Sequence, residues 1–228
     1  EPGKGEQMTG DHAASWATAT LSLSTKMGIL LEEAGLSRLF YDIEMPLLGV
    51  LADMEIAGVG VDPEMVQQMA KEFAGKIDAI LQEIYSMAGF EFNVNSTRQL
   101  GEVLFDRLHL PRGKKTKTGY STNAEVLEEL ARHHGIAAKV LEYRQVQKLK
   151  STYLDGILDL IDRDTCRVHT TFNQTVTATG RISSAEPNLQ NIPIRMETGR
   201  LIRKIFVPGP GRLLVAGDYS QIELRVLA

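Results

Sequence analysis

The sequence of 228 residues contains a single cysteine, Cys166, so no disulfide can form within the chain, which fits a reducing compartment. It has no uninterrupted apolar run long enough to cross a membrane, and its N-terminus, EPGKGEQMTGDHAASWA, lacks the basic-then-apolar pattern of a secretory signal. Its 5 histidines do not follow the spacing of a zinc site. These absences argue against a disulfide-stabilised secreted domain and against a membrane protein. At 43% apolar and 24% charged residues, the composition is that of an ordinary soluble protein with one large or two small domains.

Charge is unevenly distributed along the chain. The formal net charge is −4, which by itself argues against a nucleic-acid partner. Residues 1–140, however, hold 13 Lys and Arg against 20 Asp and Glu, whereas residues 141–228 hold 12 against 9. Binding a polyanion requires a local basic surface and not a basic chain, so the C-terminal part could supply such a surface.

The first two thirds of the sequence predict helices. The clearest is 62–89, where Asp62 is a good N-cap, Pro63 suits the first turn, and Gly89 marks the end. Its apolar residues form one stripe at helical spacing, which indicates core packing: Met65, Met69, Phe73, Ile77, Ile80, Leu81 and Ile84. Further helices are expected over 15–35, 39–58 with Pro46 near its start, 95–108 with a Ser96–Gln99 capping box, 123–135 ending at a glycine, and 136–162.

The pattern changes after Asp162. CRVHTTFNQTVTATGRIS, 166–183, alternates and is rich in Thr and Val, which predicts strands, and a Pro/Asn/Ser loop follows it. RLIRKIFVPGPGRLLVAGDYS, 200–220, is typical of a strand, a Pro-Gly turn and a second strand. Helices followed by an antiparallel run predict an α+β fold.

The stretch GDYSQIELRVLA, 217–228, has two acids at an expected strand–helix junction. Asp218 follows the apolar run RLLVAG, and Ser220 and Glu223 have capping-box spacing at the start of a helix. The simplest interpretation is a turn acid and a helix cap. The alternative is that Asp218, fixed at the end of a strand, is an oxygen ligand for Mg²⁺.

Two motifs, TATGRISSAEPNLQNIPIR and GDYSQIELR, resemble those of the family A DNA polymerases of the bacterial DNA polymerase I type. EMPLLGVLADMEIAGVGVD, FNVNSTRQLGEVLF, KKTKTGYST and LEYRQVQKLKSTY resemble further family segments in the same order, so the likeness runs from about Ser22 to Ala228. It implies a mostly helical thumb with long antiparallel helices, plus part of the antiparallel-sheet palm of a right-hand polymerase. It also implies four segments: 1–37, a lead-in and the last helix of an exonuclease-like domain; 38–60, a palm-entry helix; 61–150, the thumb; and 151–228, the first part of the palm.

The resemblance implies template-directed DNA synthesis by two Mg²⁺ ions. Asp218 and the backbone carbonyl of Tyr219 would be metal ligands, and Asp218 and Glu223 would be catalytic, with Glu223 as the steric gate under the sugar. The dNTP site would comprise Tyr219, Ser220, Gln221, Ile222 and Glu223. In this family a second catalytic aspartate and the fingers, which hold the triphosphate, come from later segments that this sequence does not contain. We therefore expect the chain to be inactive without a C-terminal polymerase fragment. That fragment could have been separated from it by a natural split, a nick or a truncation.

The resemblance also implies contacts with primer-template DNA. Arg181 would reach the minor groove, where a donor can check base-pair shape without reading sequence. The full expected set is Lys114, Lys115, Lys117, Thr118, Ser121, Arg144, Lys148, Lys150, Thr177, Arg181, Asn188, Gln190 and Asn191. Two plainer interpretations remain: loop capping for PNLQN, and a solvated helix face for Arg144 and Lys148. A non-catalytic DNA-binding module and an assembly partner are the alternative functions. A bacterial, cytoplasmic and nucleoid-associated location is expected.

Overall fold

The computed structural model describes residues 10–111, 115–116, 119–194 and 197–228. The chain divides into two compact units, one formed by 1–57 with 174–182 and the other by 58–173 with 183–228. Among the described residues, no helix is long and apolar enough to span a membrane. The α+β prediction is confirmed, since the structure is mostly helical with small antiparallel sheets.

The first unit is a run of helix. It comprises α1 (Gly10–Glu33), α2 (Ser37–Leu39), a π-helical turn η1 (Phe40–Glu44) and α3 (Met45–Ala57). Pro46 lies in the first turn of α3, as expected, but helix precedes it. Because Pro46 has no N–H to donate, the preceding turn adopts i→i+5 bonding, with Met45 N–H donating to Phe40 O. The Gln174 amide donates to both the backbone oxygen and the carboxylate of Glu44, at 3.1 and 2.6 Å, and so attaches the 174–182 loop to this unit.

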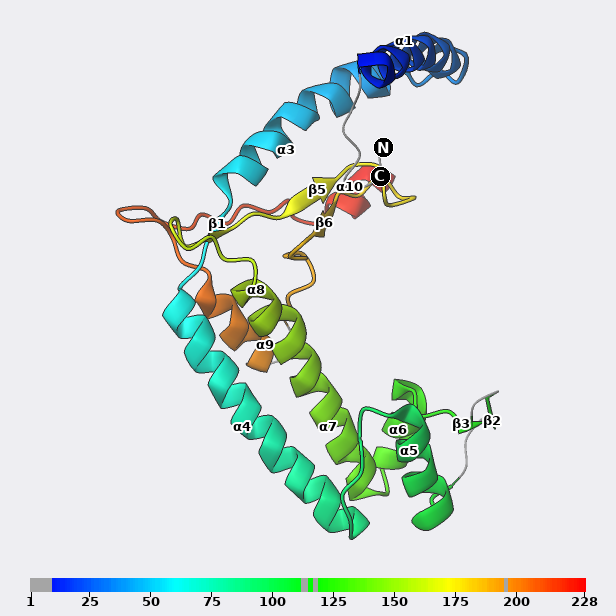
Figure 1. Ribbon diagram of the computed structural model, residues 1–228, viewed down its shortest axis with the longest axis vertical. Coiled ribbons are helices and arrows are strands. Elements are labelled where there is room, and N and C mark those ends of the chain that lie inside the picture. Colours follow the sequence, from blue (N-terminus) through cyan, green and yellow to red (C-terminus); the bar gives the residue numbers. More distant parts are fainter. Residues whose placement is uncertain (1–9, 112–114, 117–118, 195–196) are drawn as a thin grey trace. The chain divides into compact units, whose positions relative to one another are not determined.

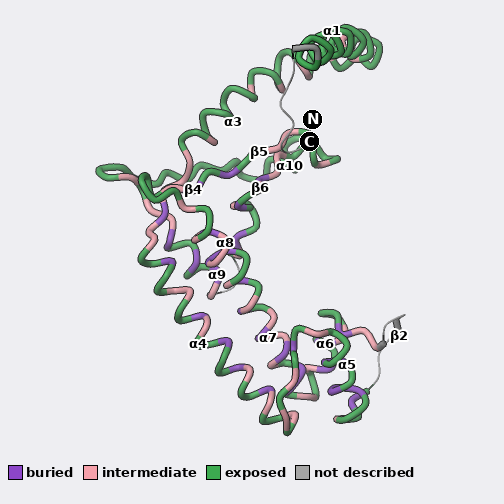
Figure 2. Tube along the Cα trace, in the orientation of Figure 1, coloured by how far each residue is buried: buried purple, intermediate pink, exposed green. Residues whose placement is uncertain are grey.

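Two long helices organise the second unit (Figure 1). They are α4 (Pro63–Ala88) and α7 (Gly135–Leu149), the latter continued by the π-helical turn η3 (Lys150–Asp155) and by α8 (Gly156–Leu158). The Asp62 carboxylate accepts the Met65 N–H at 3.0 Å, and Gly89 ends α4 with a φ of 83°, so both predicted helix signals are confirmed. Buried positions lie along the facing sides of α4 and α7 (Figure 2).

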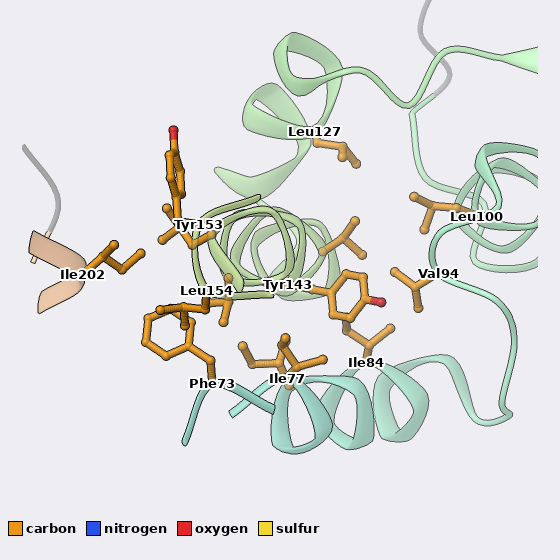
Figure 3. Packing of buried hydrophobic residues seen from close by; sticks show 14 of the residues in the cluster. Phe73, Ile77, Ile84, Val94, Leu100, Leu127, Tyr143, Tyr153, Leu154 and Ile202 are labelled. Atoms are coloured by element: carbon orange, nitrogen blue, oxygen red, sulfur yellow. The ribbon is translucent and has the colours of Figure 1, made fainter. Parts of the chain in front are cut away.

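The core lies between these helices and the shorter ones beside them. From α4, Phe73, Ile77 and Ile84 point toward Tyr143 and Leu154 (Figure 3). The predicted stripe is correct except at its start, where Val66 is fully buried and Met65 remains 37% exposed. Outside the core, Lys139 on α7 joins Glu83 on α4 at 2.8 Å. These contacts make the helix pair one packed body.

The remaining elements of this unit are short. They are α5 (Thr97–Gly101), η2 (Glu102–Arg107), α6 (Ala124–Ala131), α9 (Glu197–Ile202), η4 (Arg203–Ile205), α10 (Ile222–Leu227), and strands β1 (Val59–Gly60), β2 (Lys115–Thr116), β3 (Gly119–Tyr120), β4 (Arg167–Val168), β5 (Thr171–Asn173) and β6 (Ser183–Ala185). The sheets are antiparallel pairs, β1 with β4, β2 with β3 and β5 with β6. Strands are therefore present within 166–183, as the sequence predicts.

Several expected boundaries are wrong. Gly135 does not end a helix but begins α7, because α6 already stops at Ala131. Ser96 caps α5 by accepting the Gln99 N–H at 3.4 Å, but the Gln99 side chain reaches back to Asn93 N at 2.9 Å, so the capping box is incomplete. The Ser96 N–H, which a full capping box would give to Gln99, donates instead to Asn93 O at 3.0 Å.

Of the two strands expected in 200–220, the described residues retain only an isolated antiparallel bridge, Val61 with Phe206, in which Asp62 N–H donates to Ile205 O at 2.9 Å and Val207 N–H donates to Gly60 O at 3.0 Å. Residues 200–205 are helical because Ile202 and Ile205, three positions apart, are both fully buried on one face. Residues 213–217 have no strand beside them in the described part of the chain, and Leu213 and Val215 are 87% and 92% exposed. An extended segment becomes a sheet strand only when a neighbour accepts its backbone hydrogen bonds.

Candidate functional site

A cleft of about 970 Å³ lies in the second unit between α5–η2, residues 120–123 and α7. Two residues that the sequence assigns to DNA binding, Ser121 and Arg144, line it. Asn95, Arg98 and Asn123 add donors to its wall, and sequence reasoning missed all three. In the sequence, Asn95 and Asn123 stand out only because each lies at a predicted helix start, and nothing singles out Arg98.

Arg144 is anchored within the cleft. Its guanidinium donates to the backbone oxygen of Thr122 and, at 3.3 Å, to the Thr122 hydroxyl. Burial lowers the pKa of this arginine, and Thr122 itself is 5% exposed. The neighbouring Tyr143 hydroxyl accepts from the Asn95 amide at 2.9 Å. Arg144 is thus held in one orientation and is not the freely solvated charge that the helix-face interpretation describes.

Lys148 and Lys150 follow on the same helix but differ in their surroundings. Lys148 is exposed. The Lys150 ammonium lies 2.8 Å from both oxygens of Asp155, within the π-helical turn η3. Part of the Lys150 charge is therefore neutralised by its own turn, whereas Lys148 presents its charge to solvent. Sequence reasoning missed Asp155, because a π-helical turn is not visible in helical periodicity.

Four of the expected thumb-tip residues give little structural information. Lys114, Lys117 and Thr118 lie outside the described residues, and of Lys115 only the backbone, in β2, is described. Their assignment to DNA binding stays a prediction.

The loop around PNLQN is held by its own side chains and by the core. Asn188 Oδ1 accepts the N–H groups of Gln190 and Asn191 at 3.1 and 3.2 Å, so the expected loop-capping role is present. The Tyr153 hydroxyl donates to the backbone oxygen of Asn191, and burial raises the pKa of that hydroxyl. Arg203 donates to Ile192 O at 3.4 Å. The side chains of Asn188, Gln190 and Asn191 remain exposed on this fastened loop.

Thr177 and Arg181 belong to the other unit, in the loop that connects β5 to β6. The Thr177 hydroxyl donates to the backbone oxygen of Arg181, and Gly180 between them has a φ of 74°. A positive φ favours glycine, so the GR pair of TATGR is a formed turn. Arg181, the last residue of this turn, is exposed.

The GDYSQIELR segment is exposed. Tyr219 is 81% exposed, and α10 starts at Ile222 after Gln221, whose φ is 55°. The expected Ser220–Glu223 capping box is wrong, because Gln221 is the N-cap residue and makes no side-chain cap bond. The backbone oxygen of Ser220 instead accepts the Arg225 side chain at 2.9 Å. This left-handed residue before the helix moves Ser220 out of the cap position.

The donor types near Asp218 suit a hard cation, but their number does not complete a site. A carboxylate and a backbone carbonyl are the oxygen ligands that Mg²⁺ prefers. In the part of the chain that the structure describes, no group of three His, Cys, Asp or Glu residues could hold a metal ion. The assignment of Asp218 and Tyr219 as metal ligands therefore stays a prediction.

Comparison with known proteins supports the resemblance. The family model described as DNA polymerase family A matches residues 63–228. The chain is 52% identical over its full length to DNA polymerase I of Geobacillus stearothermophilus, and 49% identical over 98% of its length to that of Bacillus subtilis (strain 168). It spans 26% of the length of each of these relatives.

A solved structure is similar over most of the chain. It is the POL domain of Pol1 from M. smegmatis, in complex with DNA primer-template and dNTP. The TM-score is 0.84 at 45% identity, over 92% of this chain and 37% of that one. Sequence and fold agree, and the chain belongs to DNA polymerase family A.

Proposed function

We propose that this chain forms the DNA-binding thumb and the first part of the palm, including the GDYSQIELR motif, of a DNA-directed DNA polymerase. The observation that carries the proposal is the 0.84 TM-score at 45% identity with a polymerase domain whose structure contains primer-template and dNTP. The proposed partners are therefore primer-template DNA and dNTP, and the proposed location is the bacterial cytoplasm, at the nucleoid.

The proposed grip on DNA combines charge with fixed donors. Lys148 supplies an exposed ammonium, and Arg144 supplies a guanidinium oriented by Thr122. Both would contact phosphate oxygens, which positions a duplex without reading its sequence. The exposed amides of Asn188, Gln190 and Asn191, on their fastened loop, would contact the primer-template near the site of synthesis.

The proposed chemistry starts from the carboxylate of Asp218. Asp218 and the carbonyl of Tyr219 would hold Mg²⁺, which lowers the pKa of the primer 3′-hydroxyl and stabilises the charge of phosphoryl transfer. Residues 219–223 would line the dNTP, with Glu223 under its sugar. The other ligands and the fingers would come from the rest of a family A polymerase, on a longer version of this chain or on a second polypeptide.

A second candidate function is primer-template binding without catalysis. It is favoured by the exposure of the 213–219 segment and by the lack of a three-ligand acidic or histidine cluster in the described residues. Under this candidate, duplex binding would depend on salt and would be unaffected by Asp218→Ala.

Primer extension separates the two candidates. The chain is assayed alone and together with a polypeptide that supplies the C-terminal remainder of a family A polymerase domain. We expect extension only in the mixture. Asp218→Asn should lower the extension rate by at least about a hundredfold, because even replacing a residue that hydrogen-bonds to a metal ligand typically costs about 10–100-fold in activity.

The matched control is Asp159→Asn, an exposed acid at the end of α8, which should leave extension unchanged. Full activity of Asp218→Asn in the mixture would contradict the assigned metal role. Duplex binding with no extension under any condition would instead support the binding module.

A further inference from the structure

Two buried hydroxyls meet behind the PNLQN loop. Thr170 and Ser184 are 4% and 3% exposed, and their hydroxyl oxygens lie 2.6 Å apart. Thr170 comes immediately before β5, and Ser184 lies in β6, opposite Phe172. The pairing of the two strands therefore brings together side chains that are 14 residues apart in the sequence.

This pair binds the backbone of the loop that follows β6. Thr170 Oγ1 lies 3.0 Å from Ala185 O and 2.8 Å from Pro187 O, both acceptors. Ser184 Oγ lies 3.2 Å from Pro187 O and accepts the Leu189 N–H at 3.1 Å. The two hydroxyl groups thus hydrogen-bond to backbone groups on both sides of Asn188, Pro187 O and Leu189 N–H.

The arrangement allows a directed chain of hydrogen bonds. Leu189 N–H donates to Ser184, Ser184 can donate to Thr170, and Thr170 can donate to Pro187 O. In a buried setting such linked hydrogen bonds strengthen one another, and removing one leaves a costly unsatisfied partner. The pair therefore favours one backbone path for residues 185–189.

That path sets the direction of the exposed amides. Asn188 Oδ1 is already engaged by the N–H groups of Gln190 and Asn191, so its NH₂ group is the part of the side chain that can donate to a bound molecule. Displacing Pro187 or Leu189 would rotate Asn188 and alter the turn that carries Gln190.

We propose that Thr170 and Ser184 are positioning residues, which fix the 185–191 loop so that its amides face the primer-template in one orientation. This inference rests on the proposed function, since it takes nucleic acid to be the bound molecule. It adds two residues that no sequence motif assigned to the site.

The test uses the 228-residue chain and four variants. Thr170→Val removes the hydroxyl and keeps the shape, whereas Thr170→Ser keeps the hydroxyl. Ser184→Ala removes the other hydroxyl and is the second probe if Thr170→Val does not fold. Thr171→Val is the matched control, because Thr171 is the exposed neighbour in β5.

Two measurements are made on each variant. Amide hydrogen exchange over 184–192 reports the loop without any DNA, and fluorescence titration with a labelled primer-template duplex at two salt concentrations reports binding. We expect Thr170→Val and Ser184→Ala to speed exchange at Leu189 and to weaken duplex binding on the order of tenfold, the effect of about one lost buried hydrogen bond. The salt dependence should not change, because no phosphate contact is removed.

Thr170→Ser should restore both measurements, and Thr171→Val should leave both as in the unsubstituted chain. Unchanged exchange, or equal effects of Thr170→Val and Thr170→Ser, would overturn the inference while the unsubstituted chain still binds duplex. Faster exchange with unchanged duplex affinity would also overturn it. Failure of the unsubstituted chain to bind any duplex would overturn the proposed function, and the role of the pair toward DNA with it.

Discussion

Replacing Arg144 and Lys148 separately should distinguish an anchored cation from a solvated one. The two residues lie one turn apart on α7, but only Arg144 is bound to Thr122 by its guanidinium. Arg144→Met would leave the backbone oxygen and hydroxyl of a residue that is 5% exposed without their charged donor. Lys148→Met would remove an exposed ammonium at the surface.

The expected cost of Arg144→Met follows from these contacts. A hydrogen bond from a charged group contributes about 1.5–3 kcal/mol, and the bond to the Thr122 hydroxyl is long, so we expect a loss of about 2 kcal/mol. For a protein of this size, that lowers the melting temperature by about 4–8 °C. Lys148→Met should leave the melting temperature unchanged. Arg144→Lys should resemble Arg144→Met, because an ammonium cannot reproduce the two-pronged contact.

Thermal unfolding followed by circular dichroism measures this difference, and duplex titration at several salt concentrations measures the other role. If both residues contact phosphate, each Met substitution should reduce the salt slope by about 0.9. Equal stability of Arg144→Met and Lys148→Met would refute the anchoring argument. A destabilised Arg144→Met with an unchanged salt slope would show that Arg144 supports the cleft without contacting DNA.

Three further predictions concern folding. Gly58→Ala should lower the free energy of unfolding in urea by at least about 1–2 kcal/mol, because φ is +60° and a Cβ would lie 2.7 Å from the His169 ring. The matched Gly75→Ala on α4, where a Cβ would have nothing within 4 Å, should raise it by about 0.5–1 kcal/mol. Equal effects of the two would contradict this. Phe105→Ala, at a fully buried position, should lower the free energy of unfolding by about 3–5 kcal/mol in the same assay. A loss below about 1 kcal/mol would contradict the burial of this ring in the core. Hydrogen bonds from Thr165 and Asp164 lower the pKa of Asp162, so Asp162→Ala should destabilise at neutral pH, and its unfolding midpoint should approach that of the unsubstituted chain below about pH 4; a pH-independent difference would contradict it.

The features that sequence predicted correctly depend on residues close together in the chain. Asp62 caps α4 and Ser96 caps α5 through bonds to the third residue onward, and the apolar stripe of α4 repeats at helical spacing. Such signals require no knowledge of what packs against them. The family motifs are also local strings, so the resemblance could be stated before any coordinates.

The largest error in the fold prediction occurred where a distant partner decides the outcome. RLLVAGD has the composition of a buried strand, yet no described strand lies beside it, and Leu213 stays 87% exposed. The candidate site shows the same limit, since the Thr122 partner of Arg144 lies 22 residues away and the Tyr153 partner of Asn191 lies 38 away. The Ser220 error is local: the left-handed φ of Gln221 shifts the helix start, and cap spacing does not reveal a backbone angle.

The family, the long helices with their caps, and the residues expected to contact DNA and metal could thus be assigned before any coordinates were known. The contacts of Arg144 with Thr122, and of Thr170 and Ser184 with the loop carrying Asn188, became visible only in the folded chain. The physical reason is that a helix closes its hydrogen bonds within four residues. A loop or a buried hydroxyl finds its partners only when packing brings distant parts of the chain together.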